Sequence, residues 1–174
     1  GPPARSRTRR SARATARPGT RWIGTTAVSA RPQPDVWSPL EYGAHVRDVY
    51  RLYDARLDQM LSEDTPTFAN WNQDETAIKE RYKEQDPELV ADELEAAAER
   101  FDARIKSLKP EQMGRRGIRS DGAEFTVGTL IQYFLHDVIH HLWDVTGQQD
   151  AAAQALSRLL SPLALLDQML RAPV

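Results

Sequence analysis

Residues 38–61, SPLEYGAHVRDVYRLYDARLDQML, decide the fold because they predict a long helix with one buried face. Ser38 can cap this helix, Pro39 suits its first position, and Glu41 stands three residues after the cap, as in a capping box. Apolar and aromatic residues then recur at helical spacing, at Leu40, Val46, Val49, Tyr50, Tyr53, Leu57, Met60 and Leu61. A helix with such a face must be covered by other elements.

Further helices follow with short connections, and no strand pattern or repeat of fixed period is found. The expected helices are a short one near 72–84, one from the Asp86-Pro87 start to about 108, one over about 126–146, and a leucine-rich one over about 150–172. This order predicts an all-α, up-and-down four-helix bundle with an additional C-terminal helix. We expect residues 34–174 to form the bundle. The leucines of the last helix either seal it or form the face of a homodimer.

The composition limits the chemistry that the chain can perform. Hydrophobic residues make up 40% of the 174 residues and charged residues 28%, and no apolar run is long enough to cross a membrane. We therefore expect a cytoplasmic protein that does not bind a membrane. Cysteine is absent, which excludes disulfides, thiolate metal ligands and a cysteine nucleophile. A transition metal would have to be held by imidazole, carboxylate or water.

The charge is distributed unevenly along the chain. Residues 1–34 contain eight arginines and no acidic residue, which leaves 15 basic residues against 25 acidic ones in the rest of the chain. Because that body is acidic, we do not expect it to bind a nucleic acid. Residues 1–33 are interpreted as a basic, disordered arm, with a nucleic-acid-binding tail or an organelle transit segment as alternatives.

Three of the four histidines lie in one predicted helix, in residues 133–145, YFLHDVIHHLWDV. His136 and His140 are four residues apart and point to the same side of a helix, where two imidazoles can share one metal. His45, on an inward-looking face of the first helix, is the natural third ligand. Three imidazoles leave a coordination position open for water or substrate. His141 is rotated by about 100° from His140 and is not expected to join this site.

Acidic and aromatic residues near these histidines are further candidates. Ligating histidines usually donate their second N–H to a carboxylate or carbonyl, a role open to Glu41, Asp137 and Asp144. The same acids could instead be ordinary surface residues. Three aromatic residues on the histidine-bearing faces are expected to line the pocket, namely Tyr42, Tyr133 and Trp143.

Two motifs together resemble the DinB/YfiT-like superfamily. The first is VWSPLEYGAHV, with its tryptophan, Ser-Pro helix start and histidine, and the second is FLHDVIHHLWDV. The resemblance covers about residues 34–148. It implies a four-helix bundle that holds a divalent metal, typically zinc or nickel, through His45, His136 and His140. It also implies a thiol-dependent transferase or isomerase that uses bacillithiol, mycothiol or glutathione.

A shorter segment indicates which thiol is used. TFANWNQDET, residues 67–76, resembles the loop after the first helix in the actinobacterial branch of this bacterial family, which implies mycothiol as co-substrate. Trp71 would then border the substrate pocket, although packing of the loop explains it equally well.

These observations favour a metal-dependent enzyme that joins a low-molecular-weight thiol to a small electrophile. Asp137 or Asp144 would orient a ligating ring. The first alternative is a metal-dependent hydrolase with Glu41 as general base. The second is a non-catalytic bundle that binds a metal or a small molecule.

Overall fold

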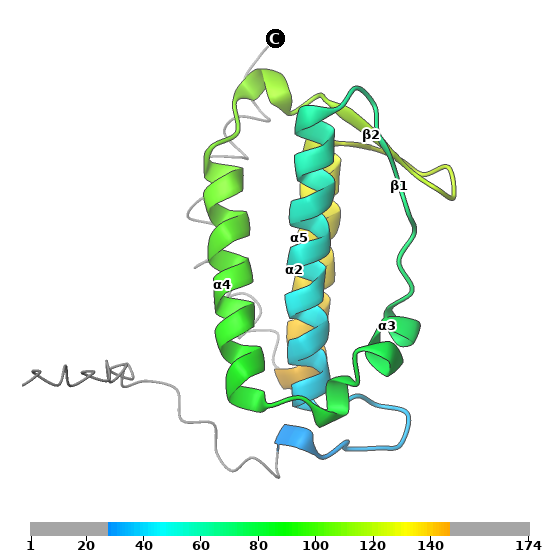
Figure 1. Cartoon of the computed structure of the whole chain (residues 1–174), viewed down its shortest axis with the longest axis vertical. Coiled ribbons are helices and arrows are strands. Elements are labelled where there is room, and N and C mark those ends of the chain that lie inside the picture. Colours follow the sequence, from blue (N-terminus) through cyan, green and yellow to red (C-terminus); the bar gives the residue numbers. More distant parts are fainter. Residues whose placement is uncertain (1–27, 147–174) are drawn as a thin grey trace, which may run out of the picture.

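The computed structural model describes residues 28–146, and within them three long helices lie side by side (Figure 1). They are α2 (Pro39–Ser62), α4 (Pro87–Lys106) and α5 (Val127–Thr146), and α2 packs against both of the others. A short helix, α3 (Gln73–Lys79), and two 3₁₀ turns, η1 (Tyr82–Glu84) and η2 (Pro110–Gln112), complete the helical part. The predicted C-terminal helix and residues 1–27 of the arm lie outside the described residues.

The first helix begins where the sequence predicts. Ser38 caps α2 by accepting a hydrogen bond from the backbone N–H of Glu41 at 3.3 Å, and its own N–H donates to the Glu41 carboxylate at 2.9 Å. Asp86 caps α4 by accepting from the backbone N–H groups of Glu88 and Leu89. Both predicted starts are therefore confirmed, and in each a proline follows the cap.

The helical bundle is confirmed, but its connectivity is corrected in one respect. Helices α2 and α4 run in the same direction, since Arg47 contacts Glu93 in their first halves and Asp54, farther along α2, contacts Arg104 close to the end of α4. Helix α5 runs the opposite way. A simple up-and-down order would need short loops, whereas residues 63–86 return along the length of the bundle before α4 begins (Figure 1).

The described residues also contain a small sheet that the sequence did not predict. Its strands are β1 (Thr67–Phe68), β2 (Arg116–Arg119) and β3 (Glu124–Thr126), in that order, with β1 parallel and β3 antiparallel to β2. Strands of two to four residues are too short to show an alternating pattern. The sheet lies at the end of the bundle where α2 ends and α5 begins (Figure 1).

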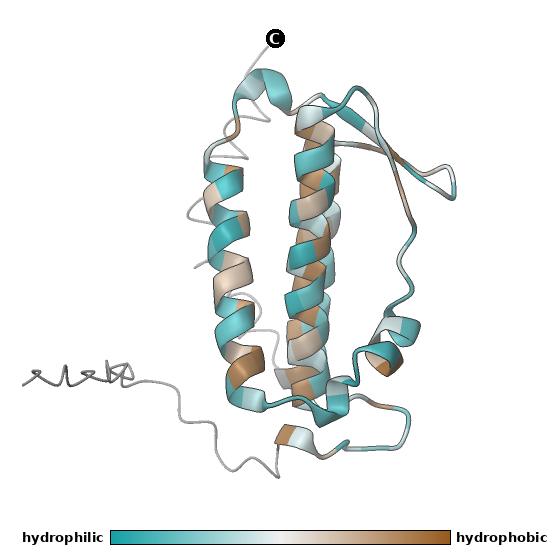
Figure 2. Ribbon diagram, viewed as in Figure 1, coloured by the Kyte–Doolittle hydropathy of each residue, from teal (hydrophilic) through white to brown (hydrophobic). Residues whose placement is uncertain are grey.

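Aromatic rings from all three long helices form the centre of the core. The Phe134 ring of α5 lies 4.8 Å from Tyr50 of α2 and 4.6 Å from Phe101 of α4, both in edge-to-face geometry. Hydrophilic and hydrophobic residues alternate along the turns of α2 and α4, as expected for helices covered on one side (Figure 2). No helix in residues 28–146 is long and apolar enough to span a membrane.

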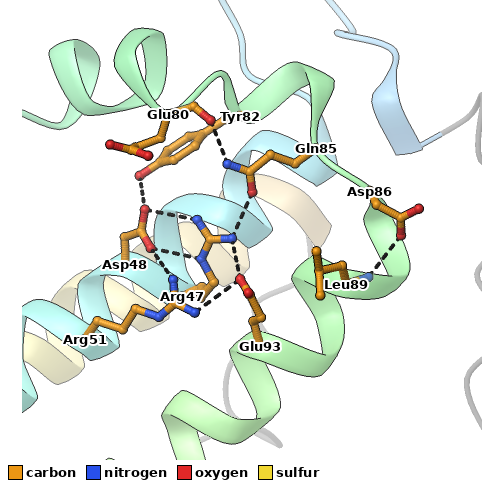
Figure 3. A network of polar contacts seen from close by, with 9 residues as sticks. All are labelled: Arg47, Asp48, Arg51, Glu80, Tyr82, Gln85, Asp86, Leu89 and Glu93. Carbon is orange, nitrogen blue, oxygen red and sulfur yellow. Dashed lines mark hydrogen bonds and ion pairs between the residues drawn. The ribbon is translucent and has the colours of Figure 1, made fainter.

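A buried ionic network joins the beginning of α2 to α4 and η1 (Figure 3). Arg47 is only 5% exposed, and its guanidinium donates to Asp48 at 2.9 Å, to Gln85 at 2.8 Å and to Glu93 at 2.9 Å. The Tyr82 hydroxyl donates to Asp48 at 2.7 Å. Because a buried charge is costly unless it is paired, this network fixes the part of α2 that carries His45.

Gly117 of β2 provides a test of how the sheet packs on the helices. A Cβ atom added there would lie 2.8 Å from Met60 Cγ and 2.8 Å from Phe68 Cε1. We expect Gly117→Ala to lower the free energy of unfolding by about 1–3 kcal/mol, because the core would be overpacked. Urea denaturation measures this. Gly114→Ala is the control, since nothing lies within 4 Å of its added Cβ, and equal effects of the two substitutions would contradict the packing described.

Candidate metal centre

Two histidines from different helices face each other inside the protein. The Nε2 atoms of His45, on α2, and His141, on α5, are 2.8 Å apart, and the ring planes are nearly perpendicular at 87°. His45 is 0% exposed and His141 is 8% exposed. Asp137 precedes His141 by one helical turn, and its Oδ1 lies 3.6 Å from His141 Nε2. One nitrogen of each ring and one carboxylate oxygen all lie within 4.8 Å of one another.

This group differs from the three ligands that the sequence predicts. His45 lies in it, but His136 and His140 are on the exposed side of α5, where their rings stack on each other with centroids 6.4 Å apart. In the part of the chain that the structure describes, only His45, Asp137 and His141 form a cluster of this kind. His141, excluded by the sequence analysis, takes the place that was expected for His140.

The packing of α5 explains which histidine points inward. The buried residues of α5 are Val127, Leu130, Ile131, Phe134, Val138 and His141. Their three- and four-residue spacing is one continuous stripe, and His141 is its next member after Val138. The sequence signal was therefore present in the apolar residues. The i, i+4 spacing of His136 and His140 alone does not show which side of α5 is buried.

The charge states of the two rings suit a cation. Burial, and secondarily the charge of His141, lowers the pKa of His45 to about 3, so the ring is neutral at neutral pH. The Nδ1 of His141 lies 3.3 Å from Asp144 Oδ2; because a carboxylate accepts, this nitrogen carries the proton and Nε2 is left as a lone pair. Burial raises the pKa of Asp137, and the charges of the neighbouring histidines oppose this.

The spacing of the three groups also suits a metal ion. Two nitrogens at about 2.0–2.1 Å from a tetrahedral zinc ion are about 3.4 Å apart. The observed separations, 2.8 Å between the imidazoles and 3.6 Å from His141 to Asp137, lie on either side of that value. His45 Nδ1 is buried and has no hydrogen-bond partner among the described residues. Nε2 of His45 is paired with His141 Nε2 in this structure and would release its proton to act as a ligand atom. With that change the three residues fit a divalent cation.

Aromatic rings enclose His45 and His141. Trp71 stacks on His45, with ring centroids 5.2 Å apart and planes at 7°, and Trp37 contacts His45 edge-on at 5.2 Å. The ring centroids of Tyr42 and His141 are 5.6 Å apart. Burial, and then the charge of Asp144, raises the pKa of Tyr42, so its hydroxyl keeps its proton. Tyr42 and Trp71, expected to bind substrate, therefore border the histidine pair.

The other predicted aromatic residues lie farther out on α5. Tyr133 and Trp143 are each 48% exposed. Tyr133 lies on the same side of α5 as Asp137, one turn earlier, and its ring contacts Phe125 edge-to-face at 5.8 Å. Neither residue forms a wall of the histidine pair, and their binding of substrate remains a prediction.

The predicted acids are already engaged in the structure. Asp144 contacts His141, as expected for a carboxylate that orients a ring, although the ring is not one of the predicted ligands. Glu41 is 2% exposed and accepts hydrogen bonds from Arg31 at 2.6 and 2.9 Å and from Ser38. Burial alone would raise the pKa of Glu41, but these bonds outweigh it and hold that pKa below its usual value. Arg31, assigned to the arm, is thus bound to the folded body.

Comparisons with known proteins agree with the helical-bundle fold. A family model described as the DinB superfamily matches residues 8–145, which is most of the chain. The structure is similar to YfiT from Bacillus subtilis, which is described as a probable metal-dependent hydrolase with an unusual four-helix bundle topology. The TM-score is 0.64 and the identity 18%, over 78% of this chain and 75% of that one, so the likeness shows the fold. No curated protein matches the sequence.

Metal analysis of single variants distinguishes the observed group from the predicted one. We expect His45→Ala, His141→Ala and Asp137→Asn each to weaken zinc or nickel binding by at least about tenfold, since each removes a ligand atom. His136→Ala and His140→Ala are matched controls from the same helix and should retain the metal. Isothermal titration and elemental analysis measure both. Loss of metal in the two controls, with retention in His141→Ala, would restore the three-histidine prediction.

The buried neutral ring of His45 also predicts a pH dependence of stability in metal-free protein. The unfolded chain binds a proton at His45 below a pKa of about 6.5, whereas the folded ring stays neutral down to about 3. The stabilisation that comes from keeping His45 neutral is therefore complete above pH 6.5 and is lost as the pH falls toward 3. Between pH 7 and pH 5 this effect lowers the free energy of unfolding by about 2 kcal/mol.

Chemical denaturation at these two pH values tests this contribution. The loss of stability on acidification should be about 2 kcal/mol smaller in His45→Gln than in the wild type. His140→Gln, which changes an exposed ring, should behave like the wild type. An unchanged pH dependence in His45→Gln would show that the ring is not buried as described.

Proposed function

The chain belongs to the DinB superfamily, and from this premise we propose that it is a metal-dependent enzyme that transfers a low-molecular-weight thiol of the mycothiol type to a small electrophile. One observation carries the proposal. Two neutral imidazoles and a carboxylate, from two helices, converge within 4.8 Å of one another in the interior of the bundle. This arrangement suits one divalent cation and leaves the cation with free coordination positions.

His45, His141 and Asp137 would hold the cation. Two imidazoles and one carboxylate suit zinc, nickel or ferrous iron, and zinc or nickel agrees with the family resemblance. When bound, the cation would supply positive charge that lowers the pKa of a coordinating thiol, so that it is present as the nucleophilic thiolate.

The remaining residues of the site prepare it for this chemistry. Asp144 accepts from His141 Nδ1 and so fixes the orientation of that ring. Trp71 and Trp37 cover two sides of His45 and keep water from it. Burial keeps His45 neutral at neutral pH, so a cation would displace only the one proton that its ring shares with His141.

The acidic residues near the site are all engaged with other groups, which favours thiol transfer over hydrolysis. Hydrolysis by metal-bound water is commonly assisted by a free acid or base near the cation, which moves a proton between the water and the leaving group. Asp137 is proposed as a ligand, Asp144 is bound to His141, and Glu41 is held by Arg31 and Ser38. A thiol, with an ordinary pKa of about 8.5, loses its proton far more readily than water and does not need a dedicated base.

Hydrolysis remains the second candidate, because the similar protein YfiT is described as a probable metal-dependent hydrolase. The third candidate is a bundle that binds a metal or a small molecule without catalysis. These three are separated by whether a metal is needed and whether a thiol is consumed.

An assay of thiol consumption tests the proposal. The full chain, loaded with zinc or nickel, is incubated with mycothiol and a reactive aryl halide, and the loss of free thiol is followed. We expect a metal-dependent rate that falls by at least about 100-fold in His141→Ala, because the cation is lost. His140→Ala should keep the wild-type rate.

The other outcomes identify the alternatives. Turnover of ester or amide substrates without added thiol, sensitive to His141→Ala, would indicate a hydrolase. A metal-loaded protein that accelerates neither reaction across panels of electrophiles and esters would contradict catalysis.

A further inference from the structure

Two arginines of α2 are equally buried but differ in their partners. Arg47 and Arg56 are each 5% exposed. Arg47 is bonded to the carboxylates of Asp48 and Glu93 (Figure 3). Arg56 forms no ion pair with any acidic residue in the described part of the chain. Burying a guanidinium without an anion costs free energy. The pairing of Arg47 offsets this cost, whereas the burial of Arg56 is left unexplained.

The surroundings of Arg56 provide partners for only some of the hydrogen-bond donors of its guanidinium. Its Nη2 donates to the backbone carbonyl of Ala69 at 2.8 Å, and its guanidinium lies 4.9 Å from the Phe68 ring and 5.5 Å from the Tyr53 ring. Its Nε is buried and has no hydrogen-bond partner among residues 28–145. Burial lowers the pKa of Arg56, and the Tyr53 and Tyr133 side chains, but no carboxylate, oppose that shift. The Nε donor is therefore left without an acceptor, and the positive charge without a carboxylate counterion, among the described residues.

A second guanidinium lies on the neighbouring strand. Arg119 of β2 is the register partner of Phe68 of β1, whose ring contacts the Arg56 guanidinium. Arg119 binds Asp121 and also lies over Phe125 at 5.8 Å. The charge of Arg119 contributes to the lowered pKa of Arg56, after the larger effect of burial. Arg119 is thus paired with a carboxylate, whereas Arg56 forms no ion pair among the described residues.

This region continues into the candidate metal centre. Tyr133, Asp137 and His141 follow one another at four-residue intervals on α5 and so lie on one side of it. The Tyr133 hydroxyl is close enough to Arg119 to add to the raised pKa of Arg119, which is due mainly to Asp121. On α2, His45 and Arg56 are eleven residues apart, or about 16 Å along the helix. An extended small molecule spans that distance.

We propose that Arg56, assisted by Arg119 and Tyr133, binds an oxyanion group of the electrophilic substrate, either a carboxylate or a phosphate. The aromatic rings of Phe68, Tyr53 and Phe125 around the two guanidiniums favour an apolar or aryl body next to that group. The inference deepens the proposed function and rests on it in assigning the anion to the substrate of the metal centre. Binding of the anion itself does not require the metal.

Anion binding is measured on the full chain after the metal and then the chelator, itself an anion, have been removed. Benzoate and inorganic phosphate are titrated separately in Tris chloride, with isothermal calorimetry and thermal unfolding as readouts. We expect the wild type to bind at least one probe, and Arg56→Met to weaken that binding at least about tenfold, the usual effect of losing a hydrogen bond to a charged group. Arg56→Lys should recover part of the affinity.

Arg100→Met is the matched control, because it removes an exposed arginine and the same charge from α4. It should leave the affinity for the probe unchanged. A preference for benzoate identifies a carboxylate, and a preference for phosphate identifies a phosphate. Failure of both probes to bind, or equal binding to the wild type and Arg56→Met, would overturn the proposal.

A second measurement applies if Arg56→Met does not fold. The Nε–H signals of Arg56 and Arg47 are followed by nitrogen-15 NMR in wild-type protein during titration with the same probes. The Arg56 signal should shift on saturation, while the Arg47 signal stays in place because its acceptors are internal. A purely structural Arg56 would show no shift, and that result would overturn the inference. Since no metal is present, failure of the proposed enzymatic function would not alter either experiment.

Discussion

Helix α2 is covered by α4 on one side and by α5 on another, so the polar side chains on its covered faces must find their partners inside the protein. Four of its acidic, basic or imidazole side chains, those of Glu41, His45, Arg47 and Arg56, are at most 5% exposed. Glu41 and Arg47 are fully paired within the chain and fix the beginning of the helix. In the described residues, the buried side-chain atoms without partners are His45 Nδ1 and Arg56 Nε. Both lie on this helix, and both belong to the regions for which we propose ligands.

The parallel course of α2 and α4 has a direct consequence for the site. Because both helices run the same way, the chain must return along the bundle between them, and residues 63–86 make that return (Figure 1). This connection places Trp71 on the His45 ring, Ala69 on Arg56 and Tyr82 on Asp48. A short hairpin between two antiparallel helices would leave this side of α2 in contact with water. The connectivity of the bundle thus creates the enclosed surroundings that the proposed chemistry requires.

The sequence predicted the helical elements well because their signals are local. The Ser38 cap and the Asp86 cap depend on residues within one turn, and both starts were predicted correctly. The strands were missed because pairing of such short segments is determined by tertiary packing. The site was predicted only in part. His45 was identified from its inward face, but the choice between His140 and His141 depends on the rotation of α5, which its apolar residues set.

The replacement of an expected imidazole by Asp137 changes the charge balance of the proposed site. Three imidazoles would leave a divalent cation with its full charge, so one bound thiolate would still leave a net positive charge in a buried place. With Asp137 as a ligand, the same thiolate makes the group neutral, which costs less in a medium of low dielectric constant. A neutral group attracts a second anion only weakly. The anionic end of the substrate would then be bound by Arg56, about 16 Å away along α2, where an uncompensated positive charge remains. Two positive centres separated along one face of α2 would in this way bind two different anions, the thiolate and the oxyanion of the electrophile, and so orient the two reactants relative to each other.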